Sequence, residues 1–265
     1  MRVYDFSMYN GEKEILEIKL NTLDKYVNFF IVGSSKFSHS GIEKGLNEIP
    51  PDLMEKFGHK IIFYEIPYTY DPNPWVFETF SREYIYNQIK NRLNSEDILH
   101  IADLDEIPKL EFFTQAIKNL IKPVTFYGSA FTFCFDLYSH ESANGILIKA
   151  GWKKDISLTW FRNNRTNYQQ KIFHIIKDSS YHFTSIGTPE QIAKKMSYFA
   201  HCNDTPFKGD VRNPEHIKTL IKNKCGFDIN TPNKLKKIEL NHNTTLPYLV
   251  DNQDKFKHLL YSNYE

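Results

Sequence analysis

One stretch of the chain, DILHIADLDEIP at residues 97–108, indicates the class of fold. Its first half is a short apolar run of the kind that forms a strand buried on both faces of a sheet. The run passes directly into a turn that carries Asp103 and Asp105, with one residue between them. Open α/β sheets bind their ligands outside the carboxyl ends of the strands, so the sequence places a candidate site at this turn.

Strand and helix patterns alternate on both sides of this stretch. Strands are predicted at residues 3–8, 26–32 and 60–66, and helices at residues 12–23, 75–93 and 110–121. An aromatic, β-rich segment follows at residues 125–138, and the remainder is more helical and irregular. The alternation predicts an α/β sandwich in which helices flank a mostly parallel central sheet. A length of 265 residues suits one large domain.

Composition argues against several classes of function. Lys and Arg number 33 against 32 acidic residues, and the net charge of +1 gives no general attraction to nucleic acid. No apolar run reaches the roughly 18 residues that a transmembrane helix needs, and the start of the chain lacks the apolar region of a signal peptide. Cys134, Cys202 and Cys225 lie far apart, which is typical of reduced thiols. We therefore expect a cytoplasmic protein without disulfides.

The acidic turn has the chemistry of a site for a divalent cation. Mg²⁺ and Mn²⁺ prefer oxygen ligands and are often shared between protein carboxylates and substrate phosphates. A metal at Asp103 and Asp105 could neutralise a diphosphate leaving group, and the sequence has no Lys/Arg cluster next to the turn for that task. The alternatives are a solvated acidic turn before a helix, or a phosphohydrolase turn, which would need Thr or Val in place of Ile107.

Short motifs in a fixed order surround the turn. The chain reads VYD at 3–5, LEIKL at 16–20, FIV at 30–32, FSHSG at 37–41, W-x-x-E-x-x-x-R at 75–82, DLDEIP at 103–108, YHFTS at 181–185 and FAH at 199–201. In this order they resemble glycosyltransferase family 17, whose best-known members are β-1,4-mannosyl-glycoprotein N-acetylglucosaminyltransferases. DLDEIP with its ordered neighbours is the specific part of the resemblance, which is densest over residues 3–113 and 181–204.

The resemblance implies a GT-A type fold and one glycosyltransferase domain over residues 1–265. Residues 1–125 would form the nucleotide-sugar-binding half, and residues 126–265 the acceptor-binding and carboxy-terminal half. It also implies an inverting, metal-dependent enzyme that uses Mn²⁺ or Mg²⁺. The expected reaction moves GlcNAc from UDP-GlcNAc to a glycan acceptor and forms a β linkage.

The resemblance further implies roles for individual residues. Metal binding is expected of Asp103, Asp105 and His201, and donor binding of Glu78, Arg82, Glu106 and His182. Each role has a structural alternative. The residues Glu78 and Arg82 stand one helical turn apart and could form a surface ion pair, Glu106 could stabilise a helix start, and the histidines could be hydrogen-bonded core residues.

The base that accepts the proton of the acceptor hydroxyl is expected among the acids after the turn. The candidates are Asp136, Glu141 and Asp155. We choose Asp155 because it follows Trp152, whose ring could stack on a sugar, by three residues.

Two departures from the family pattern keep other functions open. Gly33 stands where the family has Glu after the second strand, a position expected to face the nucleotide, and Gly11 is inserted between Asn10 and Glu12. Competing hypotheses are a catalytically silent glycan-binding protein on the same fold and a metal-dependent phosphohydrolase.

Overall fold

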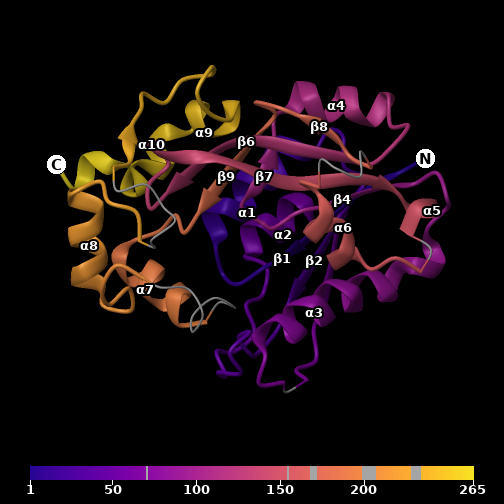
Figure 1. Ribbon diagram of the computed structural model, residues 1–265, viewed down its shortest axis with the longest axis horizontal. Coiled ribbons are helices and arrows are strands. Elements are labelled where there is room, and N and C mark those ends of the chain that lie inside the picture. Colours follow the sequence, from indigo (N-terminus) through magenta and orange to yellow (C-terminus); the bar gives the residue numbers. More distant parts are fainter. Residues whose placement is uncertain (70, 154, 168–171, 199–206, 228–233) are drawn as a thin grey trace.

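The computed structural model, shown in Figure 1, describes residues 1–69, 71–153, 155–167, 172–198, 207–227 and 234–265. Its strands are β1 (Val3–Met8), β2 (Phe29–Ser34), β3 (Ile61–Glu65), β4 (Ile98–Ile101), β5 (Glu106–Pro108), β6 (Val124–Thr132), β7 (Leu137–Lys149), β8 (His174–Ile176), β9 (Ser180–Thr184) and β10 (Lys236–Lys237). Its helices are α1 (Lys13–Leu23), α2 (Pro51–Phe57), α3 (Pro74–Ile89), α4 (Leu110–Lys118), α5 (Ala150–Lys153), α6 (Leu158–Asn164), α7 (Pro189–Tyr198), α8 (Pro214–Lys222), α9 (Pro247–Asp251) and α10 (Gln253–Phe256). Short 3₁₀ turns occupy Lys90–Arg92, Lys257–Leu259 and Tyr261–Asn263.

The strands of the described residues form one mixed sheet, in the order β3-β2-β1-β4-β7-β6-β9-β5, with β8 paired to β6 and β10 to β7. The first four strands in this order are parallel, whereas β7 pairs antiparallel with β4. Helices α1, α2, α4 and α9 pack on one face, and α3, α5 and α6 pack on the other. The predicted α/β sandwich is confirmed. The run of four adjacent parallel strands lies in the amino-terminal half, and β6 also pairs parallel with β8 and β9.

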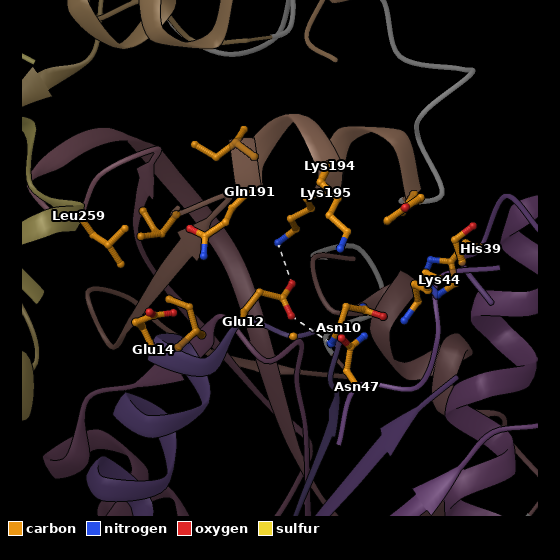
Figure 2. A pocket seen from close by; sticks show the side chains of 16 residues that line it. Asn10, Glu12, Glu14, His39, Lys44, Asn47, Gln191, Lys194, Lys195 and Leu259 are labelled. Carbon is orange, nitrogen blue, oxygen red and sulfur yellow. Dashed lines mark hydrogen bonds and ion pairs between the residues drawn. The ribbon is translucent and has the colours of Figure 1, made fainter. Parts of the chain in front are cut away.

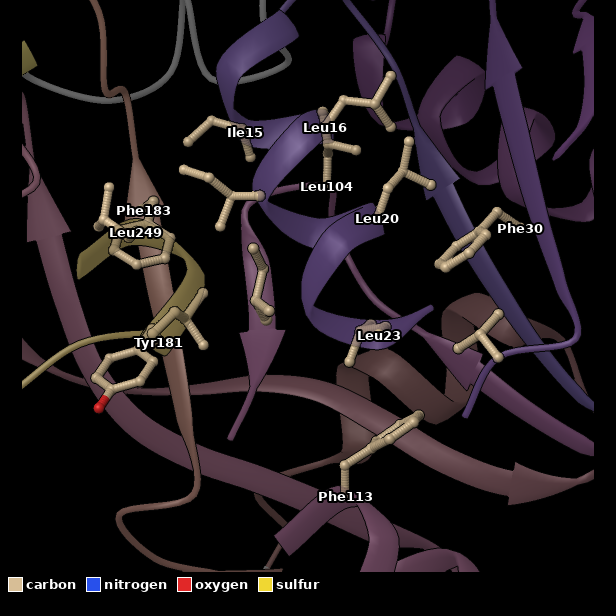
Figure 3. Packing of buried hydrophobic residues seen from close by; sticks show 14 of the residues in the cluster. Ile15, Leu16, Leu20, Leu23, Phe30, Leu104, Phe113, Tyr181, Phe183 and Leu249 are labelled. Carbon is tan, nitrogen blue, oxygen red and sulfur yellow. The ribbon is translucent and has the colours of Figure 1, made fainter. Parts of the chain in front are cut away.

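The two-residue period of the strands determines which side chains each face buries. In β1, Val3 packs in the core under α1, whereas the next residue, Tyr4, packs in the core under α3. The acidic turn is anchored in the first of these cores, because Leu104 is only 4% exposed. Figure 3 shows Leu104 beside Leu16 and Leu20 of α1. The residue between the two aspartates therefore holds the turn against the helix.

The carboxy-terminal segment packs back onto α1. Glu17, although acidic, is 3% exposed and accepts a hydrogen bond from the Tyr248 hydroxyl at 2.7 Å. The ammonium of Lys255 pairs with the same carboxylate oxygen. These contacts compensate the burial of the Glu17 charge and tie α9 and α10 to the amino-terminal half. No helix among the described residues combines the length and apolar character needed to cross a bilayer.

Gly33 lies inside β2 and faces the core. A Cβ at this position would stand 2.8 Å from Ile66 Cδ1 and 2.8 Å from Ile85 Cγ2. These side chains belong to the core under α3, so there is no space for the family's Glu. The expectation that position 33 faces the nucleotide is corrected: packing, not donor choice, accounts for the glycine.

Replacing Gly33 by alanine is expected to lower the free energy of unfolding by about 1–3 kcal/mol, because the added methyl overpacks the core. The second change Ile66→Val removes the Cδ1 atom that the methyl meets, so the double variant should recover part of the loss. Urea unfolding followed by circular dichroism measures both. A Gly33→Ala variant as stable as the wild type would show that the core has room for the methyl.

Candidate active site

The acidic turn follows β4 and is held by backbone contacts. The N–H of Asp103 donates to Glu106 Oε2 at 2.8 Å, and the N–H of Glu106 donates to the Asp103 carbonyl at 3.1 Å. The buried ammonium of Lys19 on α1 donates to the same carbonyl at 3.1 Å. With Leu104 packed in the core, the carboxylates of Asp103 and Asp105 both line one cleft.

A buried polar network supports Lys19 beneath the turn. Its ammonium donates to Ser7 Oγ at 2.6 Å and lies 3.4 Å from Asp5 Oδ1, which His100 Nδ1 contacts at 2.6 Å. Burial pushes the pKa of Asp5 upward, but Lys19 and His100 outweigh it and hold that pKa below its ordinary value. Burial lowers the pKa of His100. The network therefore sets the Lys19 amine and Nδ1 of His100 against the same carboxylate oxygen of Asp5.

Asp103 lies between two guanidinium groups. Arg82 of α3 donates to Oδ1 at 2.8 Å, and Arg162 of α6 donates to Oδ2 at 2.7 Å. Burial raises the pKa of Asp103, yet Arg162 and Arg82 outweigh it and hold this pKa well below its ordinary range. Each carboxylate oxygen already accepts a charged hydrogen bond, so the charge of Asp103 is largely used by the arginines and attracts a metal less than an unpaired carboxylate would.

Two glutamates complete this ion-pair network. Glu106 is 2% exposed and accepts hydrogen bonds from Arg162 at 2.7 and 3.1 Å. Glu78 accepts from Arg82 at 2.9 Å. Glu78 and Arg82 do form the ion pair expected one helical turn apart. The pair is not on the surface, because Arg82 is buried and also binds Asp103. Glu78 lines the cleft, whereas Glu106 is not part of its lining and contacts Arg162, which is.

Asp105 faces a different pair of cations. Its Oδ1 lies 3.5 Å from Nε2 of His182 on β9, and its Oδ2 lies 3.4 Å from Nζ of Lys195 on α7. Burial raises the pKa of Asp105, but Lys195 and His182 lower it to about 2. Burial lowers the pKa of His182, and Asp105 raises it above its ordinary value. These distances are longer than those at Asp103, so the oxygens of Asp105 are bound less strongly by their neighbours and are more available to a ligand.

For a divalent cation, the described cleft residues place one carboxylate and one imidazole together, at Asp105 and His182. Carboxylate and imidazole are ligands that proteins offer to such ions. Within the described ranges no group of three His, Cys, Asp or Glu is arranged to hold a metal. Further ligands would have to come from the donor diphosphate and water, as is common for Mg²⁺. His201, the other expected ligand, lies outside the described residues.

A cleft of about 570 Å³ joins these groups. On the α3 side it is lined by Trp75, which is 37% exposed. On the α6 side it is lined by Arg165, which donates to the carbonyls of Ala143 at 3.2 Å and Arg162 at 2.7 Å. No described carboxylate pairs with Arg165, and burial together with Arg162 lowers its pKa. The cleft therefore offers an aromatic ring and a guanidinium that a ligand can use.

The expected base lies outside this cleft. Asp155 is exposed between α5 and α6 and is not part of the described lining. Asp136 is buried and accepts a hydrogen bond from the backbone N–H of Tyr261 at 2.8 Å, which is a structural role. Glu141 is exposed on β7. None of these three acids lines the cleft that contains Asp105.

Sequence reasoning missed the basic residues of the site. The fold brings three cationic side chains to the turn. They are Arg162 of α6, Arg165 at the end of α6, and Lys195 of α7. The expectation that no Lys/Arg cluster serves the turn is therefore corrected. One signal was available in the sequence: Arg162 and Arg165 are three residues apart, which places them on one face of a helix.

An acidic turn at the carboxyl end of a central strand lies where open α/β sheets bind ligands, and the fixed cations opposite it can stabilise negative charge that develops in a reaction. The chain belongs to glycosyltransferase family 17, whose family model matches residues 1–264. The resemblance seen in the sequence is confirmed. The protein is a glycosyltransferase, and its family implies a nucleotide-sugar and an acceptor as substrates.

Comparisons beyond the family are distant. No curated protein sequence matches the chain. Among solved structures, 4-diphosphocytidyl-2C-methyl-D-erythritol synthase is similar at a TM-score of 0.44 and 10% identity, covering 66% of this chain and 89% of that one. S. aureus TarS 1-349 is similar at 0.42 and 12% identity, covering 84% and 66%. A glycosyltransferase involved in the glycosylation of the major capsid of PBCV-1 is similar at 0.35 and 9% identity, covering 72% and 97%. No conclusion about substrates follows from these values.

Proposed function

We propose that this glycosyltransferase moves GlcNAc from UDP-GlcNAc to a glycan acceptor, with inversion to a β linkage and with Mn²⁺ or Mg²⁺ at Asp105. The position of Asp105 carries the proposal. It is a deprotonated acid at the carboxyl end of β4, it faces the cleft, and its two oxygens lie 3.5 and 3.4 Å from His182 and Lys195. The identity of the sugar and the nucleotide rests on the family resemblance.

The charges of the cleft fit a diphosphate leaving group. Asp103, Glu106 and Glu78 occupy Arg82 and Arg162, so these arginines form a fixed frame rather than free cations. Arg165 and Lys195 remain to contact the diphosphate, and His182 joins them when it does not hold the metal. Cations held in place before the reaction stabilise charge that develops as the glycosidic bond breaks. A divalent ion at Asp105 and His182 would add positive charge at the same point.

The remaining parts of the substrates are assigned by position. Trp75 at the cleft wall offers an aromatic face for the base or a sugar ring. We assign donor binding mainly to residues 1–125 and acceptor binding mainly to residues 126–265, although Arg165, His182 and Lys195 reach the donor site from the second half. Glu12 is the described cleft acid that neither an arginine nor the proposed metal holds, so we assign it, rather than Asp155, as the candidate base that accepts the acceptor's proton.

Incubation with UDP-GlcNAc, UDP-glucose, UDP-galactose and GDP-mannose is expected to give slow hydrolysis of UDP-GlcNAc that Mn²⁺ stimulates and a chelator suppresses. Nucleotide release is measured by ion-exchange chromatography. Hydrolysis of another donor instead would replace the proposed sugar or nucleotide. Glycan binding without turnover of any donor would favour the silent glycan-binding protein. Release of phosphate from simple phosphate esters would favour the phosphohydrolase.

A further inference from the structure

A second pocket of about 290 Å³ adjoins the cleft. Figure 2 shows its walls: the start of α1 with Glu12, the segment after β2 with His39 and Lys44, and α7 with Lys194 and Lys195. The residues Glu12, His39 and Lys195 line the pocket and the cleft alike. A ligand in the pocket can therefore extend into the cleft past the pair of Glu12 and Lys195.

The acids of this pocket already have cationic partners. Glu12 lies 3.4 Å from the ammonium of Lys195 and accepts the backbone N–H of Asn10 at 3.0 Å. Glu14 lies 3.6 Å from Nε2 of His258. Neither acid forms an ion pair with the other two lysines of the pocket, Lys44 and Lys194.

Lys44 is the unusual member of the set. Its Nζ is buried, and no described residue provides it with a hydrogen-bond partner. Burial lowers the pKa of Lys44, Glu12 raises it, and the neighbouring Lys194 lowers it again. Lys194 stands on the exposed side of α7 and forms no ion pair with the described residues. An ammonium without a partner is costly when buried, and an anion between the two lysines would supply the missing partner.

We propose that this pocket binds an anionic group of the acceptor, a phosphate or a carboxylate carried by a sugar. We assign the pocket to the acceptor rather than the donor because, of the groups assigned to the donor diphosphate, Arg165 and His182 line the cleft but not this pocket, and only Lys195 borders both. The assignment of this anion to the acceptor rests on the proposed function, whereas the anion site itself rests on the lysines alone. The acceptor would then be an acidic or phosphorylated glycan.

The probes are inorganic phosphate, glucose 6-phosphate, glucuronate and neutral glucose, each titrated by calorimetry with and without saturating UDP. We expect glucose 6-phosphate or glucuronate to bind more tightly than glucose. The variant Lys44→Met keeps the length of the side chain without its charge, and it should weaken binding of the anionic sugar by about tenfold, since it removes a charged hydrogen bond. The exposed Lys122→Met, away from both pockets, serves as the matched control.

Thermal melting provides the second readout. Lys44→Met removes a buried ammonium without a partner, so it should melt no lower than the wild type, and a loss of binding cannot then be assigned to misfolding. Equal binding of the anionic sugars to wild type and Lys44→Met would overturn the proposal. A variant that binds UDP more weakly while sugar binding is unchanged would also overturn it, because the pocket would then serve the donor. Absence of UDP binding to the wild type would count against the proposed function, whereas phosphate binding would still test the pocket.

Discussion

Replacing Lys19 by methionine is expected to lower the free energy of unfolding by about 3–5 kcal/mol. The side chain is 1% exposed, and its ammonium contacts Ser7, Asp5 and the carbonyl of Asp103. Methionine fills similar space but leaves Asp5 as a buried carboxylate without its ammonium partner. Burial lowers the pKa of His100, which opposes protonation of the imidazole as a substitute for that charge.

Urea unfolding compares this variant with Lys13→Met on the same helix. Lys13 pairs with Asp52 at 3.0 Å, but both side chains are about half exposed, at 44% and 51%. Such surface pairs contribute roughly 0–1 kcal/mol. The second change Asp5→Asn removes the orphaned charge and should restore part of the stability of Lys19→Met. Equal losses for Lys19→Met and Lys13→Met would show that the buried pair is not a stabilising unit.

The change Lys19→Met should also disturb the site, because the Lys19 ammonium donates to the Asp103 carbonyl in the acidic turn. The residues VYD at 3–5 and LEIKL at 16–20, which carry the family resemblance in sequence, contain Asp5 and Lys19. In the structure both belong to the support of the turn rather than to the cleft. These motifs therefore have a physical reason that does not involve contact with substrate.

Local patterns predict much of the fold. Apolar runs indicate β1 to β4 because a strand covered on both faces is mostly apolar, although β1 also buries Asp5 and β4 buries His100. The period of α3 follows from the core that it covers. Helix ends were less predictable, since α3 gives way to a 3₁₀ turn at Lys90 where no glycine or proline marks an end. Short elements such as α2 and β8 depend on tertiary contacts and have too few residues to show a period.

The site was predictable in its acids and not in its cations. Asp103 and Asp105 adjoin a strand in sequence, so the position of the turn follows from the strand. Arg162 meets Glu106 across 56 residues, and Lys195 meets Asp105 across 90. Such contacts depend on the antiparallel pairing of β5 with β9 and on the packing of α6 and α7, which no local pattern encodes. The same long-range contacts separate the two aspartates, which sequence alone treated as equivalent.

Replacing Asp105 by asparagine is expected to reduce Mn²⁺-dependent UDP affinity by about tenfold, or about 1.4 kcal/mol, and turnover by about a hundredfold or more. The change keeps the shape of the side chain and removes the charge that would hold the cation. Some loss of stability should accompany it, because the Asp105 side chain is only 15% exposed and lies near Lys195 and His182. Thermal melting measures that loss, and Asp178→Asn, whose side chain is 76% exposed, is the control.

The chelator titration gives the more decisive comparison. Without a metal, Asp105 is a negative charge beside the place proposed for the diphosphate, so Asp105→Asn should bind UDP as well as the wild type or better. With Mn²⁺ the order should reverse, because only the wild type recruits the ion. A reversal of sign between the two titrations cannot arise from misfolding, which would weaken binding in both. If wild type binds UDP equally with Mn²⁺ and with chelator, then Arg165, Lys195 and His182 carry the diphosphate without a metal, and the metal role of Asp105 is wrong.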